Sequence, residues 1–467
     1  MAIEADYVII GAGAVGLAFA DTILSESQYT VAIIDRYAMP GGHWNDAYDF
    51  VTLHQPSAFY GINALPLGND RIDTTGPNAG LYELANGPDI LSYFQRVMNQ
   101  VLLPTGRCTY LPKHEHLDDK TIRALDTGES LPFKARRKWV DGTYYGTTVP
   151  SRHTPAFDVA PGAQLVPPNA LSSLFATHEH GYAHVCVIGA GKTAMDAAHW
   201  LLVQGIDPGL ISWVMPRDSW LLNRRYTQPG MAFFEETIGK QAEQMQILSE
   251  AESVEDLFLR LEAAGIMLRL DRNIIPRMYH CATMSEAEVK TLSEIKTLHR
   301  EGRIAAITPS GLTFERGSKI SKPEKTLYID CTATAVEARP ARPVFEANRI
   351  TLQMIRPCQP TFSAAMAAHL ELAYADTDRK NQLSHVPPLC DSPDGFLPMT
   401  LGNMMNQYLW GREDGLRKWM RRSRLDGFAK VVAGADPENR AHQNILARFR
   451  HFTPGAVANL QKLMAAG

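Results

Sequence analysis

The sequence has no uninterrupted apolar stretch of the roughly 18 residues that a membrane-spanning helix needs. Its N-terminus also lacks the basic start, apolar core and cleavage site of a signal peptide. The formal net charge is -4, so the chain has no excess of positive charge with which to bind a nucleic acid. These absences predict a cytoplasmic protein that binds neither membranes nor nucleic acids.

Cysteine motifs are also absent. The six cysteines lie far apart and form no Cys-x-x-Cys pair, which is typical of reduced thiols in an intracellular protein. We expect no metal site, because the groups His178-Glu179-His180 and His114-x-His116 have no cysteine partners. The chain also lacks the Gly-x-Ser-x-Gly nucleophile elbow, so acyl transfer has no support.

The chain does have the length and apolar content for a folded core. It has 467 residues, of which 45% are hydrophobic and 21% are charged, as is usual for globular proteins. A chain of this length accommodates two or three domains. Two glycine-rich segments indicate how these domains are built.

The segment Asp6–Asp35 predicts a strand, a glycine turn, a helix and a second strand. Gly11 permits the tight turn, Gly13 lets the backbone approach a pyrophosphate, and Gly16 lets the helix pack close to the strand. Asp35 ends the second strand, where a carboxylate accepts hydrogen bonds from an adenosine ribose. Because both strands, the helix and the acid accompany the glycines, the segment predicts a dinucleotide site. The alternative is an ordinary strand-helix-strand turn.

A second segment of the same design follows. The turn passes through Gly189 and Gly191, and Ala194 takes the third glycine position. The next strand ends at Arg217 instead of an acid. Arginine pairs with a 2′-phosphate that an acid would repel, which favours NADP over NAD; the alternative is a surface arginine. A phosphate-loop interpretation of GAGKT fails, because Cys186 stands where that motif needs its first glycine.

The loop after Asp35 is rich in glycine and aromatic residues. Gly42 permits close contact with a ligand, and His43, Trp44, His54 and Tyr60 supply aromatic and hydrogen-bonding groups just beyond the first dinucleotide site. A loop of this length is usually functional. The alternative is a loop whose aromatic residues only pack over a core.

The rest of the chain gives weaker signals. Residues 88–99 have helical spacing, and residues 111–140 alternate like the small strands of an inserted sheet. Prolines in residues 140–169 exclude a central strand and indicate the connection into a second domain. Residues 231–303 are helical and charged, which predicts an insertion or cap. The basic run around Trp419 predicts a solvated helix face with tryptophan in the core.

Two elements near the end of this region are predicted to return to the first domain. The apolar run Leu327–Ile329, followed by Asp330, predicts a buried strand that fits the first domain better than the second. Pro360 and Thr361 then begin a helix of small and apolar residues. A helix N-terminus aimed at a ring carbonyl would stabilise negative charge there.

These patterns predict an α/β fold with two Rossmann-like dinucleotide-binding domains, the second inserted in the first. We expect the first part of the first dinucleotide-binding domain over residues 1–180. The second, NAD(P)-binding domain, with its helical insertion, is expected over residues 181–325. Residues 326–467 are expected to return to the first domain and to end in a helical region.

The chain resembles flavin-containing monooxygenases and their Baeyer–Villiger and N-hydroxylating relatives. The resemblance covers about residues 5–60, 185–225 and 325–375. The residues that carry it are Gly11, Gly13, Gly16 and Asp35, then Gly41-Gly42-x-Trp44, and then Gly189-x-Gly191-x-Thr193-Ala194-x-Asp196. It implies that NADPH on the second domain reduces FAD on the first, and that the reduced flavin captures O2 as a peroxyflavin that oxygenates a small organic substrate.

The resemblance also implies site residues. Asp330 would lie on the strand that returns to FAD, although Ala333 replaces the glycine that normally follows the threonine. The helix at Thr361 and Phe362 would point at the flavin N1 and O2 edge. A hydrogen-bond donor is needed beside the peroxide, and His54, Gln55 and the bound nicotinamide are the candidates.

The chain departs from the family at the monooxygenase signature F-x-G-x-x-x-H. Its closest counterparts, Phe157 and Gly162, are too far apart, and Val166 stands where the histidine belongs. The family often has an asparagine near the reactive flavin carbon, and this chain has His54-Gln55 there. Disulfide-reductase chemistry has less support, since no cysteine pair follows the first fingerprint.

We therefore predict catalytic roles for His54, Gln55 and Tyr60. The residues predicted to bind FAD or NADPH are Gly11, Gly13, Gly16, Asp35, Arg36, Gly42, His43, Trp44, Asp330, Thr361, Phe362, Gly189, Gly191, Thr193 and Arg217. Two alternatives stay open. One is a flavin dehydrogenase or oxidase that takes hydride directly from its substrate, and the other is a non-redox nucleotide-binding protein. The sequence assigns neither the substrate nor the oligomeric state.

Overall fold

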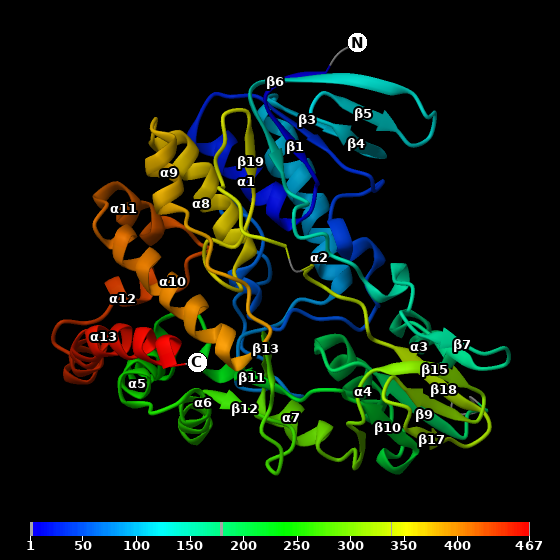
Figure 1. Cartoon of the computed structure of the whole chain (residues 1–467). Helices are drawn as coiled ribbons and strands as arrows, with labels where there is room; N and C mark the ends of the chain where they lie inside the picture. The colour runs from blue at the N-terminus through cyan, green and yellow to red at the C-terminus, as the bar shows by residue number, and fades with distance from the viewer. Residues whose placement is uncertain (1–2, 178–180, 338, 467) are drawn as a thin grey trace.

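The computed structural model describes residues 3–177, 181–337 and 339–466. Two parallel β-sheets lie at different ends of the molecule, and helices of the C-terminal part cover one side (Figure 1). We call the parts built on these sheets the first unit and the second unit. The chain leaves the first sheet after β6, builds the second unit and returns to the first sheet with β19. The predicted α/β fold class, with one unit inserted in the other, is confirmed.

The first sheet has the order β3-β2-β1-β6, with β19 beside β6, and all of these neighbours run parallel. β4 and β5 extend it by antiparallel pairing with β6, as the alternation over residues 111–140 predicts. Helices α1 and α8 share the core of this unit. The elements are β1 Ile3–Ile10, α1 Ala14–Glu26, β2 Val31–Ile34, α2 Gly87–Arg96, β3 Cys108–Leu111, β4 His114–Asp118, β5 Thr121–Ala124, β6 Ser130–Asp141, β19 Arg349–Thr351 and α8 Pro360–Ala373.

The second sheet has the order β14-β10-β9-β18-β8 and is also parallel throughout. A small sheet of β15, β16 and β17, with β7 along its edge, packs on one face. The elements are β7 Asp158–Val159, β8 Gln164–Val166, α3 Leu171–Leu174, β9 His184–Ile188, α4 Lys192–Val203, β10 Ile211–Val214, β14 Thr297–His299, β15 Ile304–Thr308, β16 Gly311–Phe314, β17 Lys319–Ser321 and β18 Thr326–Asp330. β8 lies at an edge, as the prolines around it require.

The strand at Asp330 lies in the second sheet, so the prediction that it returns to the first domain is wrong. β18 pairs with β9 and β8 in the second sheet, and β19 is the strand that returns to the first sheet. All five residues of β18 are buried, so its apolar pattern suits the centre of either sheet and does not discriminate between them. β8 precedes residue 181 and β18 follows residue 325, so the second sheet draws strands from both sides of residues 181–325.

The insertion over residues 231–303 is mixed and not wholly helical. β11, β12 and β13 form a three-stranded sheet, and β14 joins the second sheet. β11 Ser219–Asn223 precedes this region, whose elements are α5 Phe234–Glu250, α6 Val254–Ala263, β12 Met267–Leu268, β13 Met278–Met284 and α7 Glu286–Leu292. The short strands there depend on partners distant in the sequence, which local periodicity does not report.

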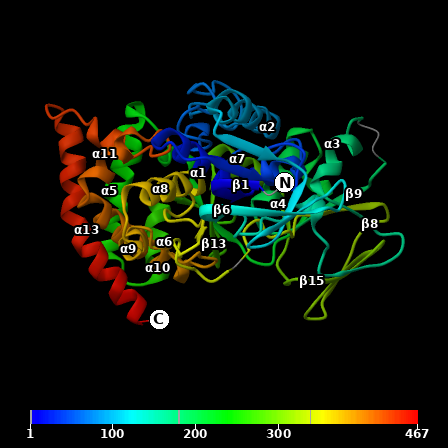
Figure 2. The same cartoon turned by 90° about the horizontal axis from the view of Figure 1, so that it is seen from above.

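Helices complete the chain. They are α9 Thr377–Leu383, α10 Pro393–Gly411, α11 Asp414–Arg422, α12 Ala429–Ala433 and α13 Arg440–Ala466. α13 lies along α5, and the Asn459 side chain donates to the carbonyl oxygens of Leu248, in the last turn of α5, and of Ala251, just after it. α13 runs along the side of the molecule away from the second sheet (Figure 2). In α11, Trp419 is buried between exposed basic residues, as predicted. Among the described residues, no helix is long and apolar enough to cross a membrane.

One disulfide, between Cys281 in β13 and Cys358 just before α8, joins the two units. It corrects the expectation that all the cysteines are reduced. The two residues are 77 positions apart, so no local motif announces the pair, and the fold alone brings them together. The cysteines that remain free are Cys108, Cys186, Cys331 and Cys390.

The glycine turn of the first unit depends on close backbone contacts. An ideal Cβ at Gly16 would lie 2.0 Å from the Gly11 carbonyl oxygen, and one at Gly142 would lie 2.8 Å from that of Ile10. Helix α1 can therefore approach β1 and the end of β6 only without side chains there.

We predict that Gly16→Ala lowers the free energy of unfolding by about 1–3 kcal/mol, because backbone must shift to admit the methyl group. Chemical denaturation measures the loss. The matched control is Gly415→Ala in α11, where a Cβ would meet no atom within 4 Å. Equal stabilities of the two variants would contradict the close contact at Gly16.

Candidate functional site

The turn of the first unit presents an uncapped helix N-terminus. Gly11 has a φ of 102°, and its N–H donates to the Ile34 carbonyl oxygen at 2.7 Å. α1 starts after Gly13, which provides no side-chain cap. The N–H groups of the first helical turn are therefore available to an anion at the carboxyl end of the parallel strands.

Asp35 lies where the sequence predicts, directly after β2. Its carboxylate accepts hydrogen bonds from the Ala12 and Tyr37 backbone N–H groups, and burial raises its pKa in spite of them. The carboxylate thus fixes the turn, and its remaining lone pairs are the ones that a ribose could use. The neighbouring Arg36 is exposed and stacks over the Tyr37 ring.

Gly42 packs directly on the turn. An ideal Cβ at Gly42 would lie 3.1 Å from the Gly13 Cα, and one at Gly13 would lie 3.6 Å from the Gly42 Cα. The Gly41 N–H also donates to the Ala12 carbonyl oxygen at 2.9 Å. The aromatic loop is thereby anchored on the first fingerprint through two glycines that face each other.

The aromatic loop is held from both ends. The Trp44 indole N–H donates to the Tyr60 hydroxyl at 2.7 Å, and the His43 ring lies 5.2 Å from the Trp44 ring. Arg424, from the basic run after α11, donates to the carbonyl oxygens of Ala58 and Tyr60 at 2.7 and 2.6 Å. The predicted residues Trp44, His43 and Tyr60 are therefore brought together on a rigid loop.

The N-terminus of α8 reaches the same loop. The Thr361 hydroxyl donates to the Phe59 carbonyl oxygen at 3.3 Å, and the helix begins without a side-chain cap. The Phe362 ring is buried in the core, with the Arg356 guanidinium 3.8 Å from its centre. Thr361 thus lies against the aromatic loop, whereas the Phe362 side chain points into the core.

The second turn is built like the first. Gly189 has a φ of 135°, and a Cβ there would lie 2.5 Å from the Cys331 carbonyl oxygen. A Cβ at Gly191 would meet no atom within 4 Å, so the space in front of α4 is open. α4 also begins without a side-chain cap. Both observations suit a phosphate group at this helix N-terminus.

The two sheets also end alike. In the first unit, the Thr143 N–H and hydroxyl both donate to Asp141 at 2.8 Å. In the second, the Thr332 N–H and hydroxyl donate to Asp330 at 2.9 and 2.6 Å. Asp330 is therefore the counterpart of Asp141, and it lies beside the second turn instead of on the strand that returns to the first sheet. The repeated Asp-x-Thr pattern is the signal that sequence reasoning missed.

Arg217 follows β10 and is exposed. Within the described part of the chain it forms no ion pair. Its neighbour Asp218 is buried and receives two hydrogen bonds from Arg300, at 2.7 and 2.9 Å. The acid beside Arg217 is thus neutralised within the protein, which leaves the Arg217 guanidinium for an external anion.

A buried network that sequence reasoning missed joins the two units. The Tyr48 hydroxyl of the aromatic loop donates to Asp196 of α4 at 2.7 Å, and Lys192 pairs with the same carboxylate. Asp196 belongs to the quoted fingerprint, but its partner is distant in the sequence. Thr193 also lies beside Tyr48 and supplies a hydrogen bond to it.

Arg224 is the centre of a second polar network between the two units. It is wholly buried and donates to the His54 carbonyl oxygen at 2.8 Å and to the Asn78 side chain at 3.2 Å. Its ion pair with Glu288 measures 2.8 Å. Arg224 therefore fixes the backbone of a predicted catalytic residue from the second unit. Gln55, the next residue, is half-buried.

The histidines of the loop are neutral at neutral pH. Burial lowers the pKa of His43 to about 4. Burial, followed by the nearby cations Lys192 and Arg224, lowers the pKa of His54 to about 3, against the opposing effect of Glu288. Each ring can then donate one hydrogen bond and accept one, but neither acts as a cation. Burial also raises the pKa of the Tyr60 hydroxyl, so it stays protonated.

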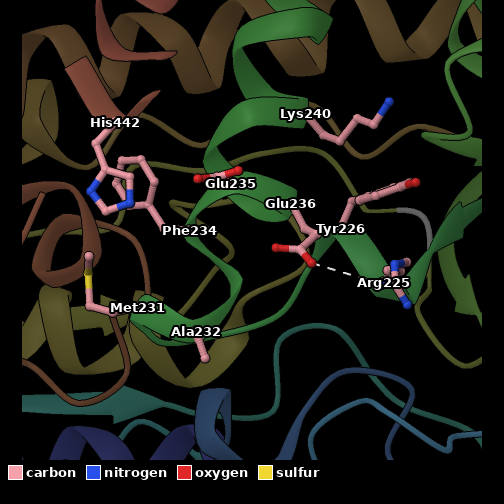
Figure 3. Close-up of a pocket in the computed structure, with 9 residues that line it drawn as sticks. All are labelled: Arg225, Tyr226, Met231, Ala232, Phe234, Glu235, Glu236, Lys240 and His442. Atoms are coloured by element: carbon pink, nitrogen blue, oxygen red, sulfur yellow. Dashed lines mark ion pairs between the residues drawn. The ribbon is translucent and has the colours of Figure 1, made fainter. Parts of the chain in front are cut away.

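A cavity of about 570 Å³ lies apart from this loop, between α5 and the start of α13 (Figure 3). It is lined by Arg225, Tyr226, Phe234, Glu236, Lys240 and His442 among others, and includes none of the predicted site residues. Arg225 and Glu236, which both line the cavity, form an ion pair at 3.9 Å.

Of the histidines considered for a metal site, His114 and His116 lie among the described residues. His114 donates a hydrogen bond from Nδ1 to the Pro112 carbonyl oxygen, 2.7 Å away, and His116 packs on the Trp139 ring. No group of metal-ligating side chains occurs in the part of the chain that the structure describes. The group His178-Glu179-His180 lies outside the described residues.

Comparison with known proteins gives the chain a family. No protein-family model matches it. Three mycobacterial proteins are 41% identical to it over 464 residues, which are 99% of this chain and 85% of each relative. They are "Uncharacterized protein Rv2000" and "Uncharacterized protein MT2056" of Mycobacterium tuberculosis and "Uncharacterized protein Mb2023" of Mycobacterium bovis. The chain belongs to this Rv2000 family. The names state no activity.

Solved structures resemble the Rv2000 family chain only distantly. The open crystal structure of cyclohexanone monooxygenase is 13% identical, with a TM-score of 0.48 over 97% of this chain and 99% of that one. OTEMO in complex with FAD and NADP is 13% identical, with a TM-score of 0.48 over 80% and 85%. A flavin-containing monooxygenase from Stenotrophomonas maltophilia is 16% identical, with a TM-score of 0.43 over 80% and 100%.

We predict that Arg224→Met lowers the free energy of unfolding by about 3–5 kcal/mol, because it leaves the Glu288 carboxylate buried without its partner. Denaturation of the single variants Arg224→Met and Glu288→Gln and of the double variant Arg224→Met/Glu288→Gln measures the coupling. The double variant is expected to regain part of the loss. Additive losses would contradict a direct pairing of these two side chains.

A second prediction concerns pH. The pKa of His54 is lower in the folded state than the roughly 6.5 of an unfolded histidine, so the unfolded chain binds the proton first. Its contribution to stability is present above about pH 6.5 and is lost as the pH falls toward 3, by at most about 1.4 kcal/mol per pH unit. The difference in unfolding free energy between the parent and His54→Asn should shift in favour of the variant below pH 6.5. A difference that is constant from pH 7.5 to 4.5 would contradict a buried neutral His54.

Proposed function

We propose that this protein is an FAD-dependent oxidoreductase that takes hydride from NADPH and oxygenates a small organic substrate with O2. NADPH, O2, a proton and the substrate would give NADP+, water and the oxygenated product. The observation that carries the proposal is the pair of uncapped helix N-termini, one at the carboxyl end of each parallel sheet. Each begins at a glycine turn that admits no side chain at its first glycine.

The residues of the first turn fit FAD. The first N–H groups of α1 would hold the pyrophosphate, and Asp35 would accept hydrogen bonds from the ribose. Gly42 and Gly13 give a backbone surface without side chains between them. The N-terminus of α8, beside Phe59, would face the ring carbonyl edge and favour negative charge there. When bound, FAD would supply the ring that accepts hydride and activates O2.

The residues of the second turn fit NADPH. α4 would hold the pyrophosphate at Gly191 and Thr193, where the space is open. Arg217 would pair with the 2′-phosphate, since Asp218 is already held by Arg300. Asp141, the counterpart of Asp330 in the first unit, would lie beside the FAD.

The side chains of the aromatic loop would orient the substrate and exclude water. Trp44 fixes the Tyr60 hydroxyl, which can donate a proton in a hydrogen bond toward the reacting atoms. The neutral His54 ring is the candidate donor beside them, and Arg224 holds its backbone in place. Gln55 remains a candidate for the same role.

We predict that NADPH bleaches a flavin bound to the purified protein in the absence of air, and that Arg217→Ala raises the Kd of NADPH by about 10- to 100-fold. This is the range expected for losing hydrogen bonds to a charged phosphate. The Kd of NADH should change less than about twofold, because it lacks that phosphate. The control is Arg316→Ala, because Arg316 is exposed and lies in the turn between β16 and β17 of the small sheet.

The anaerobic titration also separates the alternatives. A flavin that NADPH leaves oxidised but a substrate bleaches would favour a dehydrogenase or oxidase. A purified protein that binds no flavin would contradict both redox proposals and favour a nucleotide-binding role. Equal weakening of NADPH and NADH by Arg217→Ala would contradict the phosphate-pairing role alone.

A further inference from the structure

The Cys281–Cys358 disulfide connects the two units beside the candidate site. Cys281 lies in β13, within the insertion of the second unit, and Cys358 lies between β19 and α8 of the first. Both residues are half-buried, so a small thiol can approach the bond. The function proposed above makes no use of this pair.

Each cysteine is adjacent to a residue that holds the aromatic loop. Thr361, three positions after Cys358, donates to the Phe59 carbonyl oxygen at 3.3 Å. Thr283, two positions after Cys281, accepts at its carbonyl oxygen from Arg224 at 3.3 Å, and Arg224 also binds the His54 carbonyl oxygen. The bond therefore links the two segments that hold residues 54–60, one through Thr361 and the other through Arg224.

The backbone at both cysteines is unusual. Cys281 has a φ of 58° and Cys358 has a φ of 61°, a left-handed conformation that residues with a Cβ adopt rarely. In β13 the register with β11 also shifts between Trp220 and Leu222, opposite this position. Breaking the bond would let both segments relax toward more favourable conformations.

The free cysteines differ from this pair. Cys186, Cys331 and Cys390 are buried, and burial raises the pKa of each thiol, to about 12 for Cys390. Burial likewise raises the pKa of the Cys108 thiol to about 12. Thiols of this kind react slowly, because the thiolate is the reactive form. Thiol–disulfide chemistry in this protein is therefore concentrated at Cys281 and Cys358.

We propose that Cys281 and Cys358 are a reversible thiol–disulfide exchange site that braces the candidate active-site loop when oxidised and releases it when reduced. The reductant is a thiol or dithiol from solution. Its thiolate attacks one sulfur, the sulfur–sulfur bond breaks, and the other cysteine leaves as a thiolate. A second thiol then displaces the first cysteine, so that two cysteine thiols and one external disulfide result.

The geometry favours Cys358 as the leaving group. It lies directly before Gln359, the residue at the start of α8, whose N-terminus has no side-chain cap. The positive end of a helix dipole stabilises a thiolate in that position. An external thiolate would then attack the Cys281 sulfur first.

The test of the exchange uses the full chain, oxidised in air and equilibrated with rising ratios of reduced to oxidised dithiothreitol in native buffer. Alkylation with iodoacetamide and peptide mass spectrometry then report each cysteine. Cys281 and Cys358 are expected to become alkylated together in one step, while Cys186, Cys331 and Cys390 stay unmodified. Alkylation of the pair without reductant, or protection of the pair until the protein unfolds, would overturn the proposal.

The brace itself is tested by hydrogen exchange of residues 54–60 and 355–361. Exchange is expected to be about tenfold faster in the reduced protein than in the oxidised protein. The double variant Cys281→Ser/Cys358→Ser should exchange like the reduced protein, with or without dithiothreitol. The control variant Cys108→Ser should behave like the parent in both states. Equal exchange rates in the two thiol states would overturn the bracing role.

The link to the flavin site rests on the proposed function. NADPH is expected to bleach the flavin of the oxidised protein at a rate that differs by about tenfold from that of the double serine variant. Bleaching at equal rates would contradict the link and leave the proposed function intact. Absence of bleaching in both proteins would contradict the proposed function, and the thiol titration would still decide the exchange.

Discussion

Close contact of backbone at the two glycine turns is the constraint on which the rest of the structure depends. A Cβ at Gly16 would lie 2.0 Å from the Gly11 carbonyl oxygen, so α1 can approach β1 only at a glycine, and a Cβ at Gly189 would lie 2.5 Å from the Cys331 carbonyl oxygen, so the second turn can approach the end of β18 only at a glycine. This contact places an uncapped helix N-terminus at the carboxyl end of each sheet. Gly42 packs on Gly13 in the same way and positions the aromatic loop. The candidate site is thus assembled largely from backbone, and side chains refine it.

The two units are joined through buried polar groups and one covalent bond. Arg224 has no exposed surface and connects His54, Asn78 and Glu288. A buried ion pair adds less to stability than its Coulomb attraction suggests, because both charges lose their hydration. Its benefit here is geometric, since it fixes the loop backbone relative to the second unit. The disulfide between Cys281 and Cys358 reinforces the same contact from the other side.

Local patterns in the sequence are sufficient for both fingerprints, the order of the two units and the N-terminus of α8. They also identify the aromatic loop, on which Trp44, His43 and Tyr60 lie together in the structure. They fail where the decisive partner is distant. The buried run of β18 suits either sheet, so only its pairing with β9 shows that Asp330 belongs to the second unit. Arg224 and Glu288 look like surface charges until the fold buries them together, and the cysteines that form the disulfide have no motif.

The central claim is that the first glycine turn binds FAD. Native mass spectrometry of the purified chain, after incubation with excess FAD and removal of unbound cofactor, tests it most directly. The account predicts the mass of the chain plus one FAD, and loss of that added mass in the variant Gly13→Val, whose side chain would fill the space beside Gly42 and obstruct the pyrophosphate. A chain that retains no FAD under these conditions, or a Gly13→Val variant that folds and retains FAD as the parent does, would contradict the account.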